Sequence, residues 1–241
     1  MSIVTPYNHT EGSKKEQVKA MFDNIAPRYD FLNHFLSLGI DRRWRKKAIA
    51  LLQNDKPKIL LDIATGTADF AIEALTLQPD SIKGIDISNE MLDIGRKKIK
   101  KINAEHKIEL LPGDSEKINF EDNSFDAITA GFGVRNFENL SKGLSEIYRV
   151  LKKNGTLVIL EFSTPEKFPV RQIYHAYFQN ILPFIGRIVS KDNRAYSYLP
   201  ESVKTFPSGK NFIKLLNETG FSNTKCIPLT FGIASIYTGK K

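Results

Sequence analysis

From Lys58 onward, the hydrophobic and polar positions alternate between short apolar runs and amphipathic segments. This alternation is typical of a mostly parallel sheet that is covered by helices on both faces. The apolar runs predict strands at 58–63, 81–86, 107–111, 124–130 and 156–162, and two later runs at 222–229 and 232–238 predict a terminal hairpin. The pattern therefore predicts an α/β fold.

The residues before Lys58 show helical spacing instead. Val18, Met21 and Ile25 repeat on one helical face, and Pro27 is expected to end that helix. A second helix is expected to follow, capped by Asp41, with its apolar face formed by Trp44, Ala48 and Leu51. We therefore predict an N-terminal helical lid over residues 1–56 and a core over 57–241.

Two more helices are predicted in the second half of the chain. One covers 140–151 and is expected to stop at 153–155, and the other lies around 212–216 and ends at Gly220. Between them, at about 164–208, the alternation lapses and aromatic, proline and aliphatic residues crowd together. This insert is a candidate cover for a substrate, and its segment 177–189 is the richest apolar stretch.

Composition narrows the class of protein. With 241 residues and 41% hydrophobic composition, the chain can bury the core of one α/β domain. No apolar run is long enough to cross a bilayer, and the first thirty residues are too polar for a signal peptide, so we expect a cytoplasmic protein. The single cysteine, Cys226, excludes an internal disulfide and a cysteine-based metal cluster, and no metal site is predicted.

The net charge of +8 leaves two kinds of acidic partner open, nucleic acid and an anionic membrane surface. The densest basic runs are 42–47 and 96–101, both at helical positions. A solvated helix face is the simpler interpretation of the second run.

The first predicted strand ends in an unusual turn. An apolar run stops at Asp62 and breaks into small residues up to Asp69, where a helix is expected to begin. Small side chains let a ligand approach the backbone, and acids at strand ends receive hydroxyl groups. Asp86 ends the second strand, Asp114 follows the third and Gly131 follows the fourth, so four strand ends are expected to meet at one crevice.

The same turn favours one class of nucleotide over another. Ala64 and Ala68 stand where a dinucleotide-binding fingerprint requires glycine, and Asp62 with Asp69 makes the turn acidic. A diphosphate prefers a helix N-terminus without a nearby acid, whereas a sulfonium or an ammonium group suits this turn. We therefore expect S-adenosylmethionine as the cofactor. The alternative is that Asp62 only caps the turn.

Three stretches together resemble the ubiquinone/menaquinone biosynthesis C-methyltransferase family, over nearly the whole chain. They are Tyr29-Asp30-Phe31-Leu32-Asn33 with the following Asp41-Arg42-Arg43-Trp44, then Phe132-Gly133-Val134-Arg135-Asn136, and finally 149–163 from Arg149 to Ser163. The resemblance implies a class I S-adenosylmethionine-dependent methyltransferase. Its fold is Rossmann-like, with a mostly parallel seven-stranded sheet, an N-terminal helical lid and a helical insert after strand 5.

The resemblance also assigns cofactor contacts. Thr67, Asp86, Asp114 and Ser115 match the family's contacts, with Asp86 on the ribose and Asp114 with Ser115 beside the adenine; Asp62 and Gly66 of the first turn complete the predicted set. The chain departs from the family pattern at four places: Asp41 replaces a histidine, Lys153-Asn154 a Pro-Gly pair, Gly131 a serine and Ala68 a glycine. The serine contact is not carried over.

The implied reaction is methylation of a ring carbon in a polyprenylated quinol. Loss of a hydroxyl proton enriches the ring carbon in electrons, so a cation that stabilises the phenolate promotes the reaction. Arg135 is the first candidate for this role and Asn136 for the other ring oxygen, unless Arg135 only pairs with a surface carboxylate. No general base stands out between His34 and His175. Tyr174, His175 and Tyr198 are candidates to cover the quinol, although core packing of the tyrosines is the simpler alternative.

Several functions remain open at this point. We favour demethylmenaquinol as the substrate over a ubiquinone-precursor benzoquinol, and a non-catalytic nucleotide-binding protein is the rival from another class. An RNA methyltransferase is disfavoured because the chain lacks interleaved aromatic and basic residues, so no nucleic-acid partner is predicted. The segment 177–189 is a candidate groove for the isoprenoid tail, and transient contact with an anionic membrane at the inner face of the cytoplasmic membrane is expected. A homodimer is left open.

Overall fold

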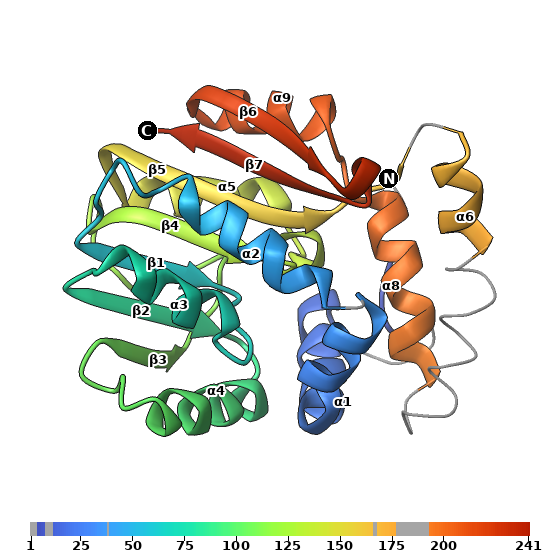
Figure 1. The fold of residues 1–241 in the computed structure, drawn as a ribbon, viewed down its shortest axis with the longest axis horizontal. Coiled ribbons are helices and arrows are strands. Elements are labelled where there is room, and N and C mark those ends of the chain that lie inside the picture. Colours follow the sequence, from blue (N-terminus) through green and yellow to red (C-terminus); the bar gives the residue numbers. More distant parts are fainter. Residues whose placement is uncertain (1–3, 8–11, 38, 166–167, 177–192) are drawn as a thin grey trace.

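A seven-stranded sheet forms the centre of the computed structural model, which describes residues 4–7, 12–37, 39–165, 168–176 and 193–241 (Figure 1). The strands are β1 (Ile59–Ile63), β2 (Ser81–Asp86), β3 (Ile108–Pro112), β4 (Phe125–Gly131), β5 (Leu151–Phe162), β6 (Ser222–Leu229) and β7 (Ala234–Lys240). Their order is β3-β2-β1-β4-β5-β7-β6, and β7 runs in the direction opposite to the other six strands. The expected α/β fold with a mostly parallel sheet is confirmed.

Helices cover both faces of this sheet. They are α1 (Lys14–Leu36), α2 (Ile40–Ala50), α3 (Asp69–Ala74), α4 (Asn89–Lys101), α5 (Leu140–Val150), α6 (Val170–Ala176), α8 (Asn193–Thr205) and α9 (Lys210–Thr219), with short 3-10 helices η1 (Leu75–Leu77), η2 (Val134–Asn136) and η4 (Thr230–Gly232). Among the described residues, no helix has the length and apolar character that a membrane span requires.

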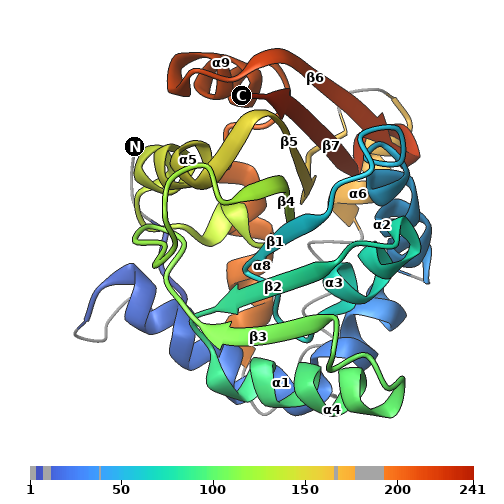
Figure 2. The same ribbon diagram turned by 90° about the vertical axis from the view of Figure 1, so that its left-hand side faces the viewer.

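The core has two layers because strand side chains alternate between the faces of the sheet. Leu60 of β1 packs in a cluster with residues of α2, α3 and α4, whereas its neighbour Leu61 packs with residues of α5 and α9. Figure 2 shows α5 and α9 on one side of the sheet and α2 and α3 on the other. Both faces of the central strands are therefore buried, as their continuous apolar runs predict.

The expectation that Pro27 ends the first helix is wrong, because α1 continues through Pro27 to Leu36. A proline removes one hydrogen bond from a helix, but contacts on both sides of it can stabilise the helix across this position. Asp23 accepts a hydrogen bond from Ser88 Oγ at 2.6 Å, and Asp30 accepts one from Thr67 Oγ1 at 2.5 Å. Tertiary contacts thus override the local signal.

The predicted cap of α2 is also wrong. Gly39 occupies the N-cap position in a left-handed conformation, and Asp41 lies buried in the first turn, where it pairs with Arg45. Leu51 is 39% exposed, and Leu52 continues the apolar face in its place. Asp41 thus contributes to a buried ion pair rather than to the helix start.

The helix expected over 140–151 ends at Val150, and β5 begins at once. Its first residue pairs with β4 at Phe125, and the pairing resumes only at Thr156 opposite Ala127. The segment 153–155 therefore forms an irregular part of β5 and does not stop the helix.

The lid and the insert meet beside the sheet. Figure 1 shows α8 alongside α1, with α6 outside it. Tyr198 of α8 packs with Val18 and Met21 of α1. By contrast, Trp44 and Ala48 of α2 belong to the main core cluster. The lid boundary at residue 56 stays a prediction.

Candidate functional site

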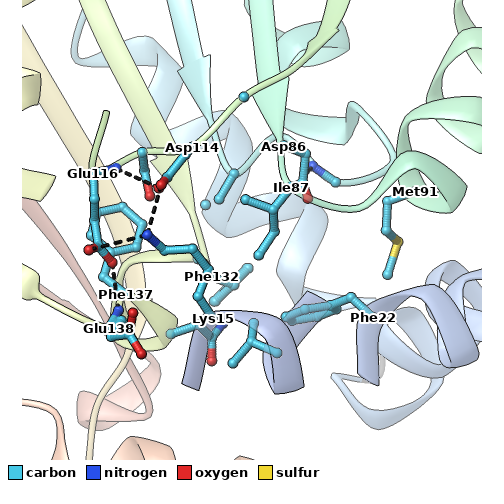
Figure 3. Close-up of a pocket in the computed structure, with 18 of the residues that line it drawn as sticks. Lys15, Phe22, Asp86, Ile87, Met91, Asp114, Glu116, Phe132, Phe137 and Glu138 are labelled. Carbon is cyan, nitrogen blue, oxygen red and sulfur yellow. Dashed lines mark hydrogen bonds and ion pairs between the residues drawn. The ribbon is translucent and has the colours of Figure 1, made fainter. Parts of the chain in front are cut away.

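A cavity of about 660 Å³, partly open to solvent, lies at the carboxyl ends of β1, β2, β3 and β4 (Figure 3). The cavity is lined by Asp86 and Ile87 after β2, Gly113, Asp114 and Ser115 after β3, Gly131, Phe132 and Asn136 after β4, and Ala64 and Gly66 after β1. The strand ends therefore meet at one crevice, as the sequence predicts.

The turn after β1 brings its backbone to this cavity through an unusual conformation. Ala64, Gly66 and Ala68 all have positive φ angles, of 51°, 55° and 66°. Left-handed alanine is uncommon, so the surroundings must hold the turn. Asp86 does so, because its Oδ2 accepts a hydrogen bond from the Gly66 N–H at 2.8 Å. The second strand end thus fixes the first.

Asp62 is buried beneath the turn. Its carboxylate accepts hydrogen bonds from Thr65 Oγ1 at 2.6 Å and from Thr129 Oγ1 at 2.7 Å. Burial raises the pKa of Asp62 to about 6, and the charge of Asp86 adds to the effect, while the two hydroxyls oppose it. These contacts tie the turn to β4. Asp62 also lines a smaller cavity beside the turn, and its contact with the cofactor stays a prediction.

Asp86 is better placed for a ligand. Besides Gly66, its Oδ1 accepts a hydrogen bond from the Ser88 N–H at 2.9 Å. Burial raises the pKa of Asp86 to about 6. The backbone of Ile87 also acts on this carboxylate. Because each carboxylate oxygen has two lone pairs, Asp86 keeps acceptor capacity for a ligand beyond these backbone contacts.

Asp114 and Ser115 form the opposite wall. Asp114 Oδ2 lies 2.7 Å from Lys15 Nζ, and Oδ1 accepts a hydrogen bond from the Glu116 N–H at 2.8 Å (Figure 3). Lys15 belongs to α1, which roofs the cavity. The roof residues are Lys15, Val18, Phe22 and Tyr29. The sequence predicts an N-terminal helical lid, but not which of its residues line the cavity, because helical spacing marks a buried face without saying what it covers.

Thr67 lies in a neighbouring cavity of about 400 Å³, which shares Ala64, Gly66 and Gly131 with the first. Arg45 Nη2 reaches Asp69 Oδ2 there at 3.2 Å. Lys98 Nζ lies 3.0 Å from Asp30 Oδ2 and also pairs with Asp69. Sequence analysis missed Arg45 and Lys98, because their partners come from elements that are distant in the chain.

The side chain of Arg135 is buried, is not among the residues that line the two cavities, and does not pair with a surface carboxylate. Its Nη1 lies 2.8 Å from Glu161 Oε1, and its backbone N–H donates to Glu161 Oε2 at 3.1 Å. Nε donates to Ser202 Oγ at 3.3 Å, and the guanidinium lies 5.5 Å from the centre of the Phe162 ring. The side chain of Glu161 is fully buried.

Asn136 differs from Arg135 because it lines the first cavity. Its side-chain nitrogen and oxygen are both buried and have no hydrogen-bond partner among the described residues. Buried amides normally find partners, so a ligand is the natural partner for this one.

Two of the predicted substrate residues lie near Arg135. The charge of Arg135 acts on both Tyr174 and Tyr198 and lowers their pKa, but burial is stronger and raises the pKa of Tyr198 to about 12 and that of Tyr174 further. The buried Tyr198 hydroxyl has no partner among the described residues. The side chains of His175 and His34 and the segment 177–189 lie outside the described part of the structure.

Comparison with known proteins identifies relatives over nearly the full length. Residues 10–241 match the model of the ubiE/COQ5 methyltransferase family. The chain is 52% identical to the demethylmenaquinone methyltransferase of Bacteroides fragilis, over 99% of this chain and 97% of the relative. It is 47% identical to the ubiquinone/menaquinone biosynthesis C-methyltransferase UbiE of Geotalea daltonii, over 95% of this chain and 97% of the relative.

Solved structures share the fold. A S-adenosylmethionine-dependent methyltransferase of Thermotoga maritima aligns with a TM-score of 0.63 at 19% identity, over 92% of this chain and 99% of that one. Phosphoethanolamine N-methyltransferase 2 of Haemonchus contortus, in complex with S-adenosylmethionine, aligns with a TM-score of 0.59 at 16% identity, over 88% of this chain and 59% of that one. The expected class I methyltransferase fold is therefore confirmed.

Proposed function

Because the chain belongs to the ubiE/COQ5 methyltransferase family, we propose that it transfers a methyl group from S-adenosylmethionine to a ring carbon of demethylmenaquinol and so forms menaquinol. Relatives named for this reaction, from Bacteroides fragilis and Porphyromonas gingivalis, are 52% and 43% identical to the chain. The observation that carries the proposal is the single cavity in which Asp86 and the unpartnered amide of Asn136 both lie.

The residues of the larger cavity suit the nucleoside half of S-adenosylmethionine. The free lone pairs of Asp86 match two vicinal ribose hydroxyls, each of which donates one hydrogen bond. Asp114 and Ser115 flank the place of the adenine. Lys15 pairs with Asp114 and holds α1 over this site. The space beside Gly66 is open, because a Cβ added there would meet no atom within 4 Å. A ligand can therefore occupy this space and approach the backbone of the turn.

The smaller cavity suits the methionine half. An α-amino acid carries an ammonium and a carboxylate, and this cavity holds both an acid and a base, Asp69 and Arg45. Their present ion pair of 3.2 Å satisfies each charge internally. We assign Arg45 to the carboxylate and Asp69 to the ammonium, with Thr67 beside them.

S-adenosylmethionine supplies an electrophilic methyl group. The quinol carbon forms the new C–C bond as the S–CH₃ bond breaks, after a hydroxyl has lost its proton, and loss of the proton on that carbon restores the ring. Arg135 stabilises the phenolate, because its guanidinium brings a positive charge to the developing negative charge on the oxygen. Asn136 holds a ring oxygen from the cavity wall and so aligns the carbon.

Tyr174 and Tyr198 are assigned to the quinol ring. Both lie close enough to Arg135 for its charge to lower the pKa of their hydroxyls. The hydroxyl of Tyr198 has no hydrogen-bond partner among the described residues. A buried hydroxyl without a partner is costly, so it favours a ligand oxygen in reach. His175 is also assigned to the quinol ring. This assignment rests on the sequence, because the side chain of His175 lies outside the described part of the structure.

The polyprenyl tail makes a membrane the natural source of the substrate. We therefore propose that the protein contacts an anionic membrane surface transiently, consistent with its net charge of +8.

A benzoquinol precursor of ubiquinone is the second candidate acceptor, because relatives such as that of Geotalea daltonii carry the name of both pathways. To identify the acceptor, the protein is incubated with labelled S-adenosylmethionine and, in separate reactions, with reduced demethylmenaquinone, with the benzoquinol and with RNA. We expect labelled menaquinone as the main product. Transfer only to the benzoquinol or to RNA would overturn the assignment of the acceptor.

A further inference from the structure

Two phenylalanine side chains protrude into solvent at one corner of the molecule. Phe168 is 81% exposed and Phe231 is 80% exposed. The other exposed large apolar side chains among the described residues, Leu51 and Ile102, are 39% and 47% exposed. Single exposed apolar residues are ordinary, but two almost fully exposed aromatic rings require an explanation.

The segments that carry these rings are bonded to each other. Ser163 lies just after β5. Its N–H donates to the Ile233 carbonyl at 2.9 Å, and its Oγ donates to the Gly232 carbonyl at 2.8 Å. Phe231 precedes these carbonyls, and Phe168 follows Ser163 at the entry to α6. In Figure 1, the start of β7 lies beside the end of β5, where the chain leaves for α6. Pro165 also lies next to Gly232. The two rings therefore lie on segments that are joined where the chain enters the insert.

The backbone at Phe231 is strained. Thr230 and Phe231 both have positive φ angles, of 44° and 59°. β-branched and aromatic residues rarely adopt this conformation, which glycine or asparagine would adopt with less strain. The exposed ring of Phe231 adds nothing to the hydrophobic core, and the strained backbone of this turn costs stability. Such an outlier indicates a role outside the folded chain itself.

Basic side chains border the same corner. Trp44 Nε1 donates to Thr230 Oγ1 at 2.8 Å, which places α2 against η4. Arg43 and Lys47, one residue before and three after Trp44, are exposed on one edge of α2. Arg45 points from the opposite edge toward Asp69 of α3. In the sheet order, β1, which leads into α3, and β7, which follows η4, lie on opposite sides of β4 and β5. Since α2 contacts β5, α3 and η4, we infer that its basic edge, opposite Arg45, is the one nearer η4.

We propose that Phe168, Phe231, Arg43 and Lys47 form a docking corner that binds the surface of an anionic lipid bilayer. The aromatic rings enter the interface between headgroups and acyl chains, while the two cations approach the anionic headgroups. The inference rests on the proposed function, since a polyprenylated quinol resides in a bilayer and must reach the insert. Docking at this corner places the entry to the insert against the lipid.

The test measures binding of the full-length protein to vesicles of phosphatidylglycerol and phosphatidylcholine at low salt. For Phe168→Ser/Phe231→Ser we expect partitioning to weaken by about tenfold or more, and for Arg43→Gln/Lys47→Gln by about tenfold. Ile102→Ser and Lys97→Gln/Lys101→Gln are matched controls on α4 and the turn after it, and should bind like the wild type. Phe231→Asn should weaken binding, though less than the double phenylalanine variant, while its melting temperature stays the same or rises, so misfolding cannot explain the weaker binding.

Three results would overturn the proposal. They are unchanged vesicle binding of the phenylalanine variant, equal binding to neutral vesicles, or a wild-type dimer that this variant converts to a monomer. Methyl transfer to a demethylmenaquinol with one prenyl unit, in solution, separates this proposal from the proposed function. The phenylalanine variant should keep that activity and lose activity on the long-tailed quinol in vesicles. If the wild type methylates neither quinol, the proposed function is wrong, whatever the result of the vesicle-binding measurement.

Discussion

The guanidinium of Arg135 and the carboxylate of Glu161 form a buried ion pair, with Nη1 2.8 Å from Oε1. Glu161 also receives the backbone N–H of Arg135 at 3.1 Å, so it holds both the main chain and the side chain of that residue. Burying a carboxylate is costly unless a cation compensates it. The pair therefore fixes the guanidinium in one orientation next to Tyr174 and Tyr198.

Glu161→Gln keeps the shape of the side chain and removes its charge. We expect kcat to fall by about tenfold to a hundredfold, because a less firmly held guanidinium stabilises the phenolate less well, while the affinity for S-adenosylmethionine stays unchanged. Steady-state kinetics and a cofactor titration measure the two effects. Glu146→Gln breaks another carboxylate–arginine pair, the one with Arg149, and is the control that should keep kcat. A cofactor affinity that falls in parallel with kcat would instead assign Glu161 a general structural role.

Asn136→Leu replaces an unpartnered buried amide by an apolar side chain of similar volume. Because leaving a buried amide unsatisfied costs about 1–3 kcal/mol, we expect this variant to be more stable than the wild type. Methyl transfer should nevertheless be lost, since the leucine can hold no ring oxygen. Thermal unfolding and the transfer assay are measured together. An active variant would show that Asn136 does not contact the reacting quinol.

Asp86→Asn should weaken S-adenosylmethionine binding, because one of the two acceptors for the ribose hydroxyls becomes a donor and the charge is lost. Hydrogen bonds to charged groups contribute about 1.5–3 kcal/mol, which corresponds to roughly tenfold to a hundredfold in affinity. Calorimetric titration measures the change. Asp93→Asn, at an exposed position on α4 where Asp93 pairs with Arg96, is the matched control. Equal affinity in Asp86→Asn and the wild type would remove Asp86 from the cofactor site.

The pH dependence of S-adenosylmethionine binding should reflect the protonation of Asp86. Burial raises the pKa of Asp86 to about 6, so its carboxylate is protonated below that pH and loses one acceptor. We expect the affinity for S-adenosylmethionine to fall as the pH drops from 7 to 5, and the affinity of Asp86→Asn to change less. Parallel pH profiles of the two proteins would contradict this.

Folding stability should respond to pH in the opposite direction at Asp62. Its folded pKa of about 6 lies above the ordinary value of 3.8, so the native state binds a proton more tightly than the unfolded state. The resulting stabilisation is complete below about 4 and disappears as the pH rises through 6. The melting temperature of Asp62→Asn relative to the wild type should therefore rise between pH 4 and 7. A constant difference would show that Asp62 titrates normally.

Much of the fold was predictable because it depends on local patterns. Alternation of apolar runs and helical spacing located all seven strands, and parallel strands necessarily bring Asp62, Asp86 and Asp114 to one edge. The helix ends were less predictable. Pro27 is a strong local signal, but the contacts of Asp23 and Asp30 that hold α1 together come from residues far away in the sequence.

The sequence predicts a site residue where a single acidic or small residue at a strand end identifies the position. It does not predict the ion pairs that form between residues of different helices and turns. Lys15 pairs with Asp114, and Arg45 with Asp69, through the placement of α1 and α2 over the turns. No spacing rule connects such residues. Glu161 lies in a motif that was recognised, yet its pairing with Arg135 follows only from the adjacency of β4 and β5.

The most direct test of the account is the position of the transferred methyl group. The protein is incubated with S-adenosylmethionine that carries an isotopically labelled methyl group, together with demethylmenaquinone in its reduced or its oxidised form. The account predicts menaquinol labelled at a methyl group bonded to a ring carbon, formed from the reduced substrate alone and lost in Arg135→Met. A label on oxygen, equal transfer to the oxidised quinone, or cofactor binding without any transfer would contradict it.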